Sequence, residues 1–225
     1  MIDFKGSQFE REIILWGVRW YVACPISYRQ LEEMRGERGG TVDHSTLNRW
    51  VIKYAPEVAK QFRCRQRPVG RSWRLDETSG KIKGKWASLD RAVDKEGPTS
   101  DFLLTPNQDR DAAEAFLHQA IRTQGLPEKI PIAQSGSNTA AITHSHRSHK
   151  TTIAIRQGKS LNNLIAQDHR AVKRKVRPRV GVKSFWAARC TIAGIEVRPA
   201  LRKGPLMTPA PSLPTPAAQF SALAA

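Results

Sequence analysis

Hydrophobic positions in the first quarter of the chain recur at helical spacing, with charged residues between them. They predict a first helix that ends before Pro25. Ser27 followed by Gln30 at the third position is typical of a capping box and predicts a second helix from Tyr28 onward. A glycine cluster that begins at Gly36 predicts a turn after it. The apolar residues of the first helix are Phe9, Ile13, Trp16, Val18 and Trp20.

A third helix is predicted from His44 to Tyr54, because Asp43 is a favoured N-cap residue and Pro56 stops the helix. Three short helices with a glycine-bearing turn before the last are typical of a helix-turn-helix DNA-binding domain. The alternative is a plain three-helix subdomain whose polar face is only solvated. The residues expected in the core are Leu47, Val51 and Tyr54. The side chains expected to reach a major groove or its phosphates are Ser45, Thr46, Asn48, Arg49 and Lys53.

From Trp73 the hydrophobic period changes to two, which indicates strands. Segments separated by glycines predict an antiparallel meander at residues 73–77, 81–83, 85–93 and 100–104. The elements expected after it are a helix at 109–123, a strand at 129–133, a helical segment at 137–147, a strand at 151–155 and a helix at 161–176. This order predicts an α/β fold class, with an N-terminal helix-turn-helix plus a ribonuclease H-like (integrase-type) mixed sheet with flanking helices.

The domain boundaries follow from the same order of elements. We expect a helix-turn-helix DNA-binding domain at residues 1–60, a basic linker at 61–71 and a ribonuclease H-like domain at 72–203. Residues 204–225 carry five prolines and no charge, so we expect a disordered Pro/Ala-rich tail without a helix.

Composition narrows the possible function classes. The 225 residues are 40% hydrophobic and 25% charged, which is ordinary for a globular chain. The net charge of +17 favours a polyanionic partner, either nucleic acid or an anionic membrane surface. No apolar run approaches the roughly eighteen residues that span a bilayer, so we expect a soluble, non-secreted chain without a membrane partner. The three cysteines are too few and too far apart for a disulfide framework, and we interpret them as free thiols.

The positive charge is concentrated toward the C-terminal part of the chain. The net charge is +5 over residues 1–72, −1 over residues 73–146 and +13 over residues 147–203. Within the last segment we expect a phosphate-binding track, with an ordinary solvated helix face as the alternative. Phe185 and Trp186 nearby are expected in the core rather than as base-stacking residues. The residues of the track are Lys173, Arg174, Lys175, Arg177 and Arg179.

A histidine-rich segment runs from His144 through His146 to His149. Three imidazoles are enough to bind a metal ion, but no Cys or carboxylate stands at regular ligand spacing and Arg147 lies among them. We interpret the segment as a solvated loop.

Several motifs occur in order along the chain and carry a resemblance to a known family. They include Asn48-Arg49-Trp50, Ser72-Trp73-Arg74-Leu75-Asp76-Glu77-Thr78, Arg91-Ala92-Val93-Asp94, Ser135-Gly136-Ser137-Asn138-Thr139, Gln167-Asp168-His169-Arg170 and Ala193-Gly194-Ile195-Glu196. Together they resemble the insertion-sequence-six family of bacterial DDE transposases over roughly residues 3–204. The resemblance implies a helix-turn-helix that binds terminal inverted repeats and a ribonuclease H-like domain that uses Mg²⁺ to cut and join DNA strands. It also implies a homo-oligomer in the DNA complex and a cytoplasmic, nucleoid-associated protein.

The three catalytic positions of the family depart from its pattern in this chain. The resemblance assigns the first carboxylate to Asp76, which is present, and the second and third to positions occupied by Ala133 and Ala166. Two divalent cations need hard anionic oxygen ligands, and methyl groups supply none. Asp168 is expected to point away from the site on its helix and Glu77 to face the other side of its strand. Further departures, at Ser79 and Asp90, stand where the family tends to carry aromatic residues.

Three hypotheses about function therefore remain open from the sequence. The first is a transposase whose catalysis is impaired in this copy, with Asp76 as the surviving metal ligand. The second is a DNA-binding protein that occupies inverted repeats or lowers the activity of an intact relative. The third is a non-functional remnant.

Overall fold

The computed structural model describes residues 2–66, 70–94, 99–106, 109–132, 142–144, 153–157, 173–175, 184–203, 206 and 215–224. These residues form two compact units. The helical unit comprises Met1–Arg67 and Ala171–Ala225, and the sheet unit comprises Pro68–Arg170. No helix within these described ranges is long and apolar enough to cross a membrane.

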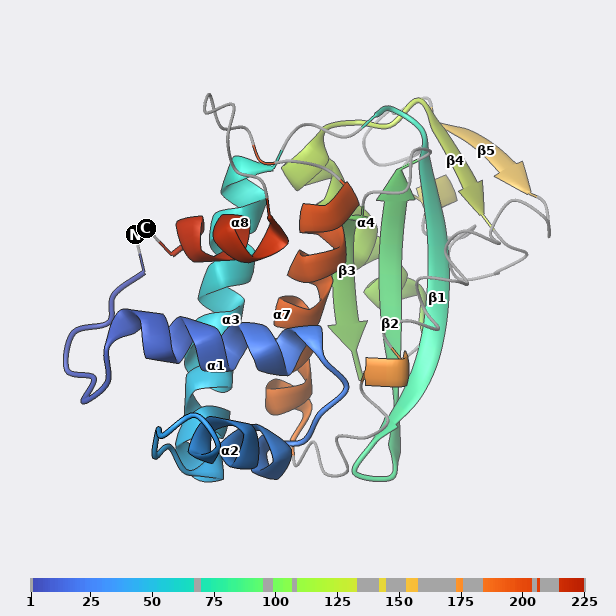
Figure 1. Ribbon diagram of the computed structural model, residues 1–225. Helices are drawn as coiled ribbons and strands as arrows, with labels where there is room; N and C mark the ends of the chain where they lie inside the picture. The colour runs from blue at the N-terminus through green and yellow to red at the C-terminus, as the bar shows by residue number, and fades with distance from the viewer. Residues whose placement is uncertain are drawn as a thin grey trace. The chain divides into compact units, whose positions relative to one another are not determined.

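The first three helices of the helical unit begin where their capping residues predict. They are α1 (Arg11–Ala23), α2 (Tyr28–Gly36) and α3 (His44–Arg65) (Figure 1). The capping box before α2 is present, because the Gln30 backbone N–H donates to Ser27 Oγ at 3.2 Å and the Ser27 N–H donates to Gln30 Oε1 at 2.8 Å. Asp43 caps α3, also as predicted.

Helix α3 is longer than predicted. It continues through Pro56 to Arg65, so the prediction that Pro56 stops it is wrong, and residues 61–65 of the expected linker are helical. An interior proline removes one backbone hydrogen bond and costs about 3 kcal/mol. The apolar face continues past it, however, with Val58 and Phe62 buried. Burying such side chains contributes about 1.5–3 kcal/mol each, which offsets the cost.

Helix α7 (Phe185–Lys203) packs against α3 and α1 within the helical unit. The approach is close at Gly194, where a Cβ atom would lie 2.6 Å from Val22 Cγ1 and 2.9 Å from Ala55 Cβ. Only a glycine fits this contact without a shift of its neighbours. The expectation that Trp186 lies in the core is wrong, because its side chain is 59% exposed at the start of the helix, whereas Phe185 is half-buried.

The expected tail contains a helix, α8 (Pro216–Ala222), so the prediction of a helix-free tail is wrong for this stretch. Thr215 caps α8, and Pro216 stands at its first turn, where the missing N–H would have no partner in any case. Phe220 and Leu223 are buried, and Arg65 Nη1 donates to the Ala222 carbonyl at 2.8 Å. The N–H of Ile2 donates to the Ala224 carbonyl, so the two ends of the chain lie side by side, as Figure 1 shows.

The sheet unit has five strands in the order β3-β2-β1-β4-β5. The first three are antiparallel, and β4 and β5 are parallel to β1. This mixed topology is that of the predicted ribonuclease H-like fold. The strands are β1 (Trp73–Ile82), β2 (Lys85–Asp94), β3 (Thr99–Thr105), β4 (Lys129–Ile132) and β5 (Ala154–Gln157).

Two details of this unit differ from the sequence prediction. The expected strands at 73–77 and 81–83 are one strand, with Gly80 inside it, because β2 pairs with the whole length of β1. Strand β5 begins at Ala154 rather than residue 151. Of the helical segments expected at 137–147 and 161–176, the structure describes residues 142–144 in this unit and residues 173–175 in the helical unit, and both stretches are helical.

Helix α4 (Arg110–Gln124) is capped by Asp109 and covers one face of the sheet. Leu75 and Ala92 on this face share a buried core with Phe116, Leu117 and Ile130. In Figure 1, α4 lies behind the strands. The core therefore fixes β1 and β4 side by side.

Candidate DNA interface and candidate catalytic site

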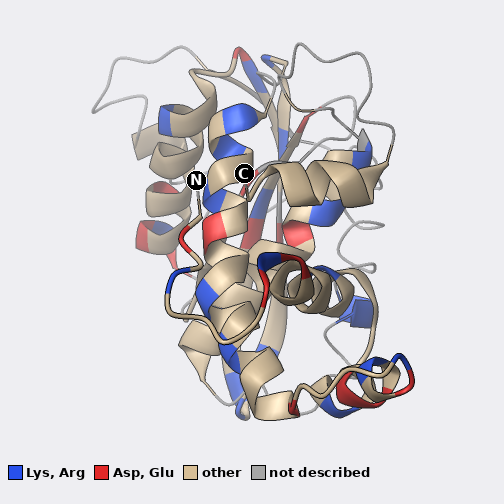
Figure 2. Ribbon diagram, turned by 60° about the vertical axis from the view of Figure 1, so that its left-hand side comes forward, with Lys and Arg blue, Asp and Glu red and all other residues tan. Residues whose placement is uncertain are grey.

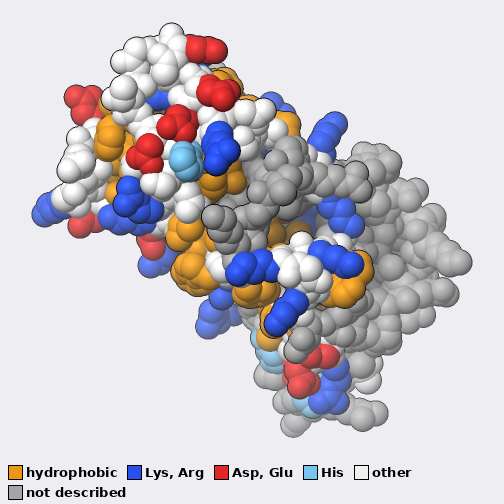
Figure 3. Space-filling view, turned by 90° about the horizontal axis from the view of Figure 1, so that it is seen from below, with side chains coloured by type: hydrophobic (Ala, Val, Ile, Leu, Met, Phe, Trp, Pro, Cys, Tyr) orange, Lys and Arg blue, Asp and Glu red, His pale blue; other side chains and the backbone are white. Residues whose placement is uncertain are grey.

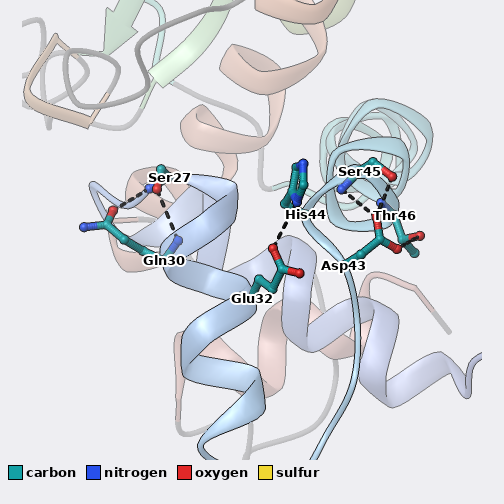
Figure 4. Close-up of polar contacts among 7 residues, drawn as sticks. All are labelled: Ser27, Gln30, Glu32, Asp43, His44, Ser45 and Thr46. Atoms are coloured by element: carbon teal, nitrogen blue, oxygen red, sulfur yellow. Dashed lines mark hydrogen bonds and ion pairs between the residues drawn. The ribbon is translucent and has the colours of Figure 1, made fainter.

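The N-terminus of α3 is organised by the Asp43 carboxylate (Figure 4). The backbone N–H groups of Ser45 and Thr46 donate to Asp43 Oδ1 at 2.9 and 3.1 Å, and both hydroxyls also donate to the carboxylate. These hydrogen bonds, from Ser45 above all and then from Thr46, hold the pKa of Asp43 well below its usual range. The hydroxyl protons of Ser45 and Thr46 are thus directed at the cap, and only their oxygen lone pairs point elsewhere.

The exposed face of α3 holds the other predicted DNA-contacting residues. Arg49 and Lys53 are exposed, and Asn48 is half-buried. Arg49 Nη2 donates to Thr46 Oγ1 at 2.7 Å, which ties the guanidinium to the cap. On the opposite side, Leu47, Val51 and Tyr54 are buried, as predicted. The helix therefore presents an amide and two cations while its apolar side fixes its position.

A second basic cluster, which was not predicted from the sequence, consists of Arg35 and Arg38 packed on Trp16 of α1. The guanidiniums of Arg35 and Arg38 lie 5.7 and 5.9 Å from the ring centroid of Trp16, within cation–π range. A Cβ atom on Gly40 would collide with the Arg35 guanidinium, so Gly40 makes room for this arginine. The signal available in the sequence was the spacing of the two arginines by three residues at the end of a helix.

The described part of the predicted phosphate-binding track, residues 173–175, is helical. Lys173 and Arg174 are exposed and Lys175 is half-buried, while Arg177 and Arg179 lie outside the described residues. Figure 2 shows both basic and acidic positions on the described helices other than α8, which has no charged residue. Three consecutive basic residues therefore distinguish this segment from those helices.

Asp76 lies within β1, where its Cα partner in β2 is the buried Arg91. On the other side of β1, Leu75 is paired with Ile132, the last residue of the parallel strand β4. The chain just before Asp76 and the chain just before position 133 are thus neighbours in the sheet. The Asp76 side chain, Ala133, Ala166 and Asp168 lie outside the described parts.

The residues at the three positions that the resemblance assigns, Asp76, Ala133 and Ala166, do not fit two divalent cations, since they offer one carboxylate and two methyl groups. Among the side chains that the structure describes, no group of three or more His, Cys, Asp and Glu residues could hold a metal ion. No catalytic step through a metal ion follows from these residues.

Glu77, the acidic neighbour of Asp76, belongs to a different environment. Ser88 Oγ donates to Glu77 Oε1 at 2.8 Å, and Asp90 is the Cα partner of Glu77 in β2. Asp90 is only 4% exposed. Burial, and secondarily the charge of Glu77, raises the pKa of Asp90 to about 7. Glu77 is therefore a half-buried carboxylate that contacts the buried Ser88 and faces the buried Asp90 in β2.

The first residue of the histidine-rich segment is paired with a carboxylate. His144 Nδ1 lies 2.7 Å from Glu114 Oε1, and His118 Nε2 lies 3.6 Å from the same oxygen. The hydrogen bond from His144, more than any other contact, lowers the pKa of Glu114. His144 is exposed and His118 is half-buried, and His146 and His149 lie outside the described residues. In the described part, His144 thus forms a surface hydrogen bond with a carboxylate.

Comparison with known proteins decides the family. A family model described as a DDE domain matches residues 70–205. The transposase for insertion sequence-like element IS431mec of Staphylococcus aureus strain Mu50 is 39% identical over 202 residues, which cover 89% of this chain and 88% of that protein. The chain belongs to the insertion-sequence-six family of DDE transposases. The transposase for insertion sequence element IS257 in transposon Tn4003 of Staphylococcus aureus is another relative, 38% identical over the same share of the chain.

Two solved structures show a weaker likeness to this transposase chain. The HTLV-2 integrase catalytic core domain in complex with magnesium (trimeric form) has a TM-score of 0.46 and 16% identity, covering 60% of this chain and 88% of that chain. The catalytic core domain of BIV integrase has a TM-score of 0.43 and 13% identity, covering 57% and 84%.

Proposed function

We propose that this chain binds the terminal inverted repeats of its insertion sequence through α3, as a homo-oligomer, and has little or no strand-cutting or strand-joining activity of its own. The exposed face of α3 carries the binding part of the proposal. It offers Asn48, Arg49 and Lys53 above a buried apolar side. Asn and Arg form bidentate hydrogen bonds with adenine and guanine edges in a major groove, and lysine pairs with phosphate.

The hydrogen bonds at the N-terminus of α3 indicate which side chains contact bases. Ser45 and Thr46 donate their hydroxyl protons to Asp43, so in this arrangement they act as acceptors. Arg49 is held by Thr46, which reduces the conformational freedom that it loses on binding. We therefore assign base reading chiefly to Asn48 and Arg49 and phosphate contact to Lys53.

The catalytic part of the proposal rests on Ala133 and Ala166. The family uses a divalent cation at these positions, and we propose that Mg²⁺ binds weakly here because Asp76 is the single carboxylate left among the three. An element has two ends, so a complex that holds both needs at least two copies of the chain.

The binding part is tested by comparing an inverted-repeat duplex with a scrambled duplex of equal length. The Asn48→Ala, Arg49→Ala double variant should lose discrimination by about 1–3 kcal/mol for each base that it no longer reads. Lys60→Ala, an exposed lysine on the same helix, serves as the matched control and should keep discrimination. Equal loss of affinity by the double variant on both duplexes would contradict the assignment of α3 as the reading helix.

The phosphate track is tested with the same duplexes at several salt concentrations. Lys173→Ala with Arg174→Ala should weaken binding to both duplexes alike. It should also lower the slope of log affinity against log salt by about 0.9 for each phosphate that the variant no longer neutralises. An unchanged slope would remove these two residues from the interface.

A further inference from the structure

The β1–β2 hairpin ends in a tip formed by residues 81–86, which lies in the sheet unit. The residues at the turn are Lys83 and Gly84, with φ of 51° and 77°. Ile82 pairs with Lys85 on either side of them, and Lys81 pairs with Trp86. A two-residue turn with both φ values positive is the type I′ turn, which matches the twist of the two strands.

Lys83 is an unusual residue for this turn. It is the one non-glycine residue with positive φ in the part of the chain that the structure describes. Asn, Asp and Gly are favoured at this position, because a longer side chain is strained in the left-handed region. The turn alone therefore gives no reason for a lysine, and the side chain at the apex needs another explanation.

The tip combines positive charge with an exposed aromatic ring. Lys81, Lys83 and Lys85 are exposed, and no acidic residue occurs between Ser79 and Ser88. The Trp86 side chain is 64% exposed, the highest value among the exposed large hydrophobic residues described. The Lys81 ammonium lies 5.0 Å from the centroid of its ring. Figure 3 shows Lys and Arg side chains beside exposed hydrophobic side chains on one face of the molecule.

A structural role for Trp86 explains only part of this arrangement. A cation–π pair at an exposed site contributes about 0.5–1 kcal/mol, which accounts for Lys81 opposite Trp86. It accounts neither for Lys83 at the apex nor for Lys85 beside the ring. A ligand that offers both negative charges and a flat aromatic face accounts for all four residues.

We infer that the hairpin tip binds DNA at unpaired bases, with Trp86 stacked on a base and the three lysines on the flanking phosphates. A base inside a duplex has both faces covered by its neighbours, so the ring of Trp86 has access only to a base at an end or in a single-stranded segment. Stacking of bases on aromatic side chains, in combination with a basic groove, is how proteins bind single strands. The inference rests on the proposed DNA binding but concerns a surface separate from α3.

The test compares two substrates that share one inverted-repeat duplex, one with blunt ends and one with a short single-stranded overhang. The full-length chain should bind the overhang substrate more tightly. Trp86→Ala should reduce that preference by about 5- to 150-fold, the factor expected for one stacked base. Trp86→Phe should retain most of the preference, since an aromatic face remains. Trp186→Ala is the matched control, because Trp186 is similarly exposed at 59%.

Lys83→Asn separates binding from folding. Asn is favoured in a type I′ turn, so this variant should unfold at the same or a higher temperature, while its affinity for the overhang substrate falls and its salt slope drops by about 0.9. A fall in affinity with no loss of stability supports the inference. Unchanged affinity of Lys83→Asn and Trp86→Ala for both substrates would overturn it.

The other possible results of these binding experiments also test the inference. Equal affinity of the unmodified chain for blunt and overhang substrates would overturn the inference and leave the role of α3 intact. A loss in Trp86→Ala that Trp186→Ala matches would also overturn it, because the effect would not belong to the tip. A change in oligomeric state of Trp86→Ala without a change in DNA affinity would overturn it as well and assign the tip to a protein contact. Failure of the unmodified chain to bind any DNA would contradict the proposed function itself.

Discussion

The exposed face of α3 and the three positions that the resemblance assigns to catalytic carboxylates differ in this chain. The first has the side chains that DNA binding requires, and the second has one of three carboxylates. On α3, the cap is complete, the apolar side is buried, and Asn48 and Arg49 remain available. At the positions that the resemblance assigns to the carboxylates, β1 and β4 are paired beside Asp76, whereas Ala133 and Ala166 have methyl side chains. The proposed function therefore separates binding from catalysis in one chain, because packing depends on apolar area while metal binding depends on a few charged oxygens.

Under the proposed assignment of Ala133 and Ala166, alanine explains how the fold persists without the catalytic carboxylates. It is small, and it is the best helix former, so Ala166 need not disturb the helix expected around it. The pairing of Leu75 with Ile132 depends on backbone hydrogen bonds and on the core beneath α4. Neither interaction needs a carboxylate at position 133.

The largest expected effect on stability concerns Gly194, which lies in the helical unit that contains α3. Gly194→Val would place side-chain atoms where Val22 and Ala55 already lie, so it should destabilise the helical unit by about 3 kcal/mol. Urea denaturation measures this change, and DNA affinity should fall with it because α7 packs on α3. Gly80→Val in β1 is the control, because a Cβ atom there meets nothing within 4 Å. Equal stability of the two variants would contradict the tight contact at Gly194.

A smaller effect on stability is expected in the sheet unit, at Asp90. The pKa of Asp90 is raised to about 7, so the folded state binds more protons than the unfolded state between about pH 4 and 7. Its contribution to stability is fully present below about pH 4 and is lost as the pH rises to about 7. Asp90→Asn should therefore stabilise the chain at pH 8, by on the order of 2 kcal/mol, and flatten the pH dependence in this window.

Thermal unfolding at pH 5 and pH 8 measures the effect of Asp90. Asp111→Asn, an exposed carboxyl in the same unit, should change neither melting temperature nor its pH dependence. DNA affinity should be unaffected by Asp90→Asn, because the residue is buried and lies away from α3 in the chain. A pH dependence that persists in Asp90→Asn would show that another group titrates.

The smallest expected effect concerns the cap of α3. Asp43→Ala should lower the melting temperature at pH 7 and weaken inverted-repeat discrimination, because it releases Ser45, Thr46 and, through Thr46, Arg49. Asp43→Asn keeps a capping side chain and should retain most of the stability. Because the pKa of Asp43 is lowered, its stabilising contribution is present above about pH 4 and is lost as the pH falls further. Identical melting temperatures of the unmodified chain and Asp43→Ala at pH 7 would contradict this role.

Local features of the fold could be predicted from the sequence because their causes are local. The capping box at Ser27, the cap at Asp43 and the alternation that gives β1 and β2 each depend on residues within a few positions. Features that depend on distant residues could not be predicted. Helix α3 continues through Pro56 because Val58 and Phe62 are buried. Helix α8 forms because Phe220 is buried against the rest of the helical unit.

The same distinction between local and distant causes applies to the candidate site. The polar and apolar sides of α3 could be read from residue spacing. The hydrogen bonds from the Ser45 and Thr46 hydroxyls to Asp43 depend on side-chain geometry that spacing does not contain, and so does the burial of Asp90 beside the half-buried Glu77. Exposure of Trp86 and Trp186 likewise depends on which surfaces neighbouring elements cover.

The central claim is that this chain binds its inverted repeats but does not join strands. It is tested most directly by a strand-joining assay in Mg²⁺ on an inverted-repeat substrate, with binding measured in the same samples. We expect the unmodified chain to bind without joined product and the double reversion Ala133→Asp, Ala166→Glu to restore joining. Each single reversion should restore much less, because the ligands act as a unit. Joined product from the unmodified chain, abolished by Asp76→Ala, would contradict the claim.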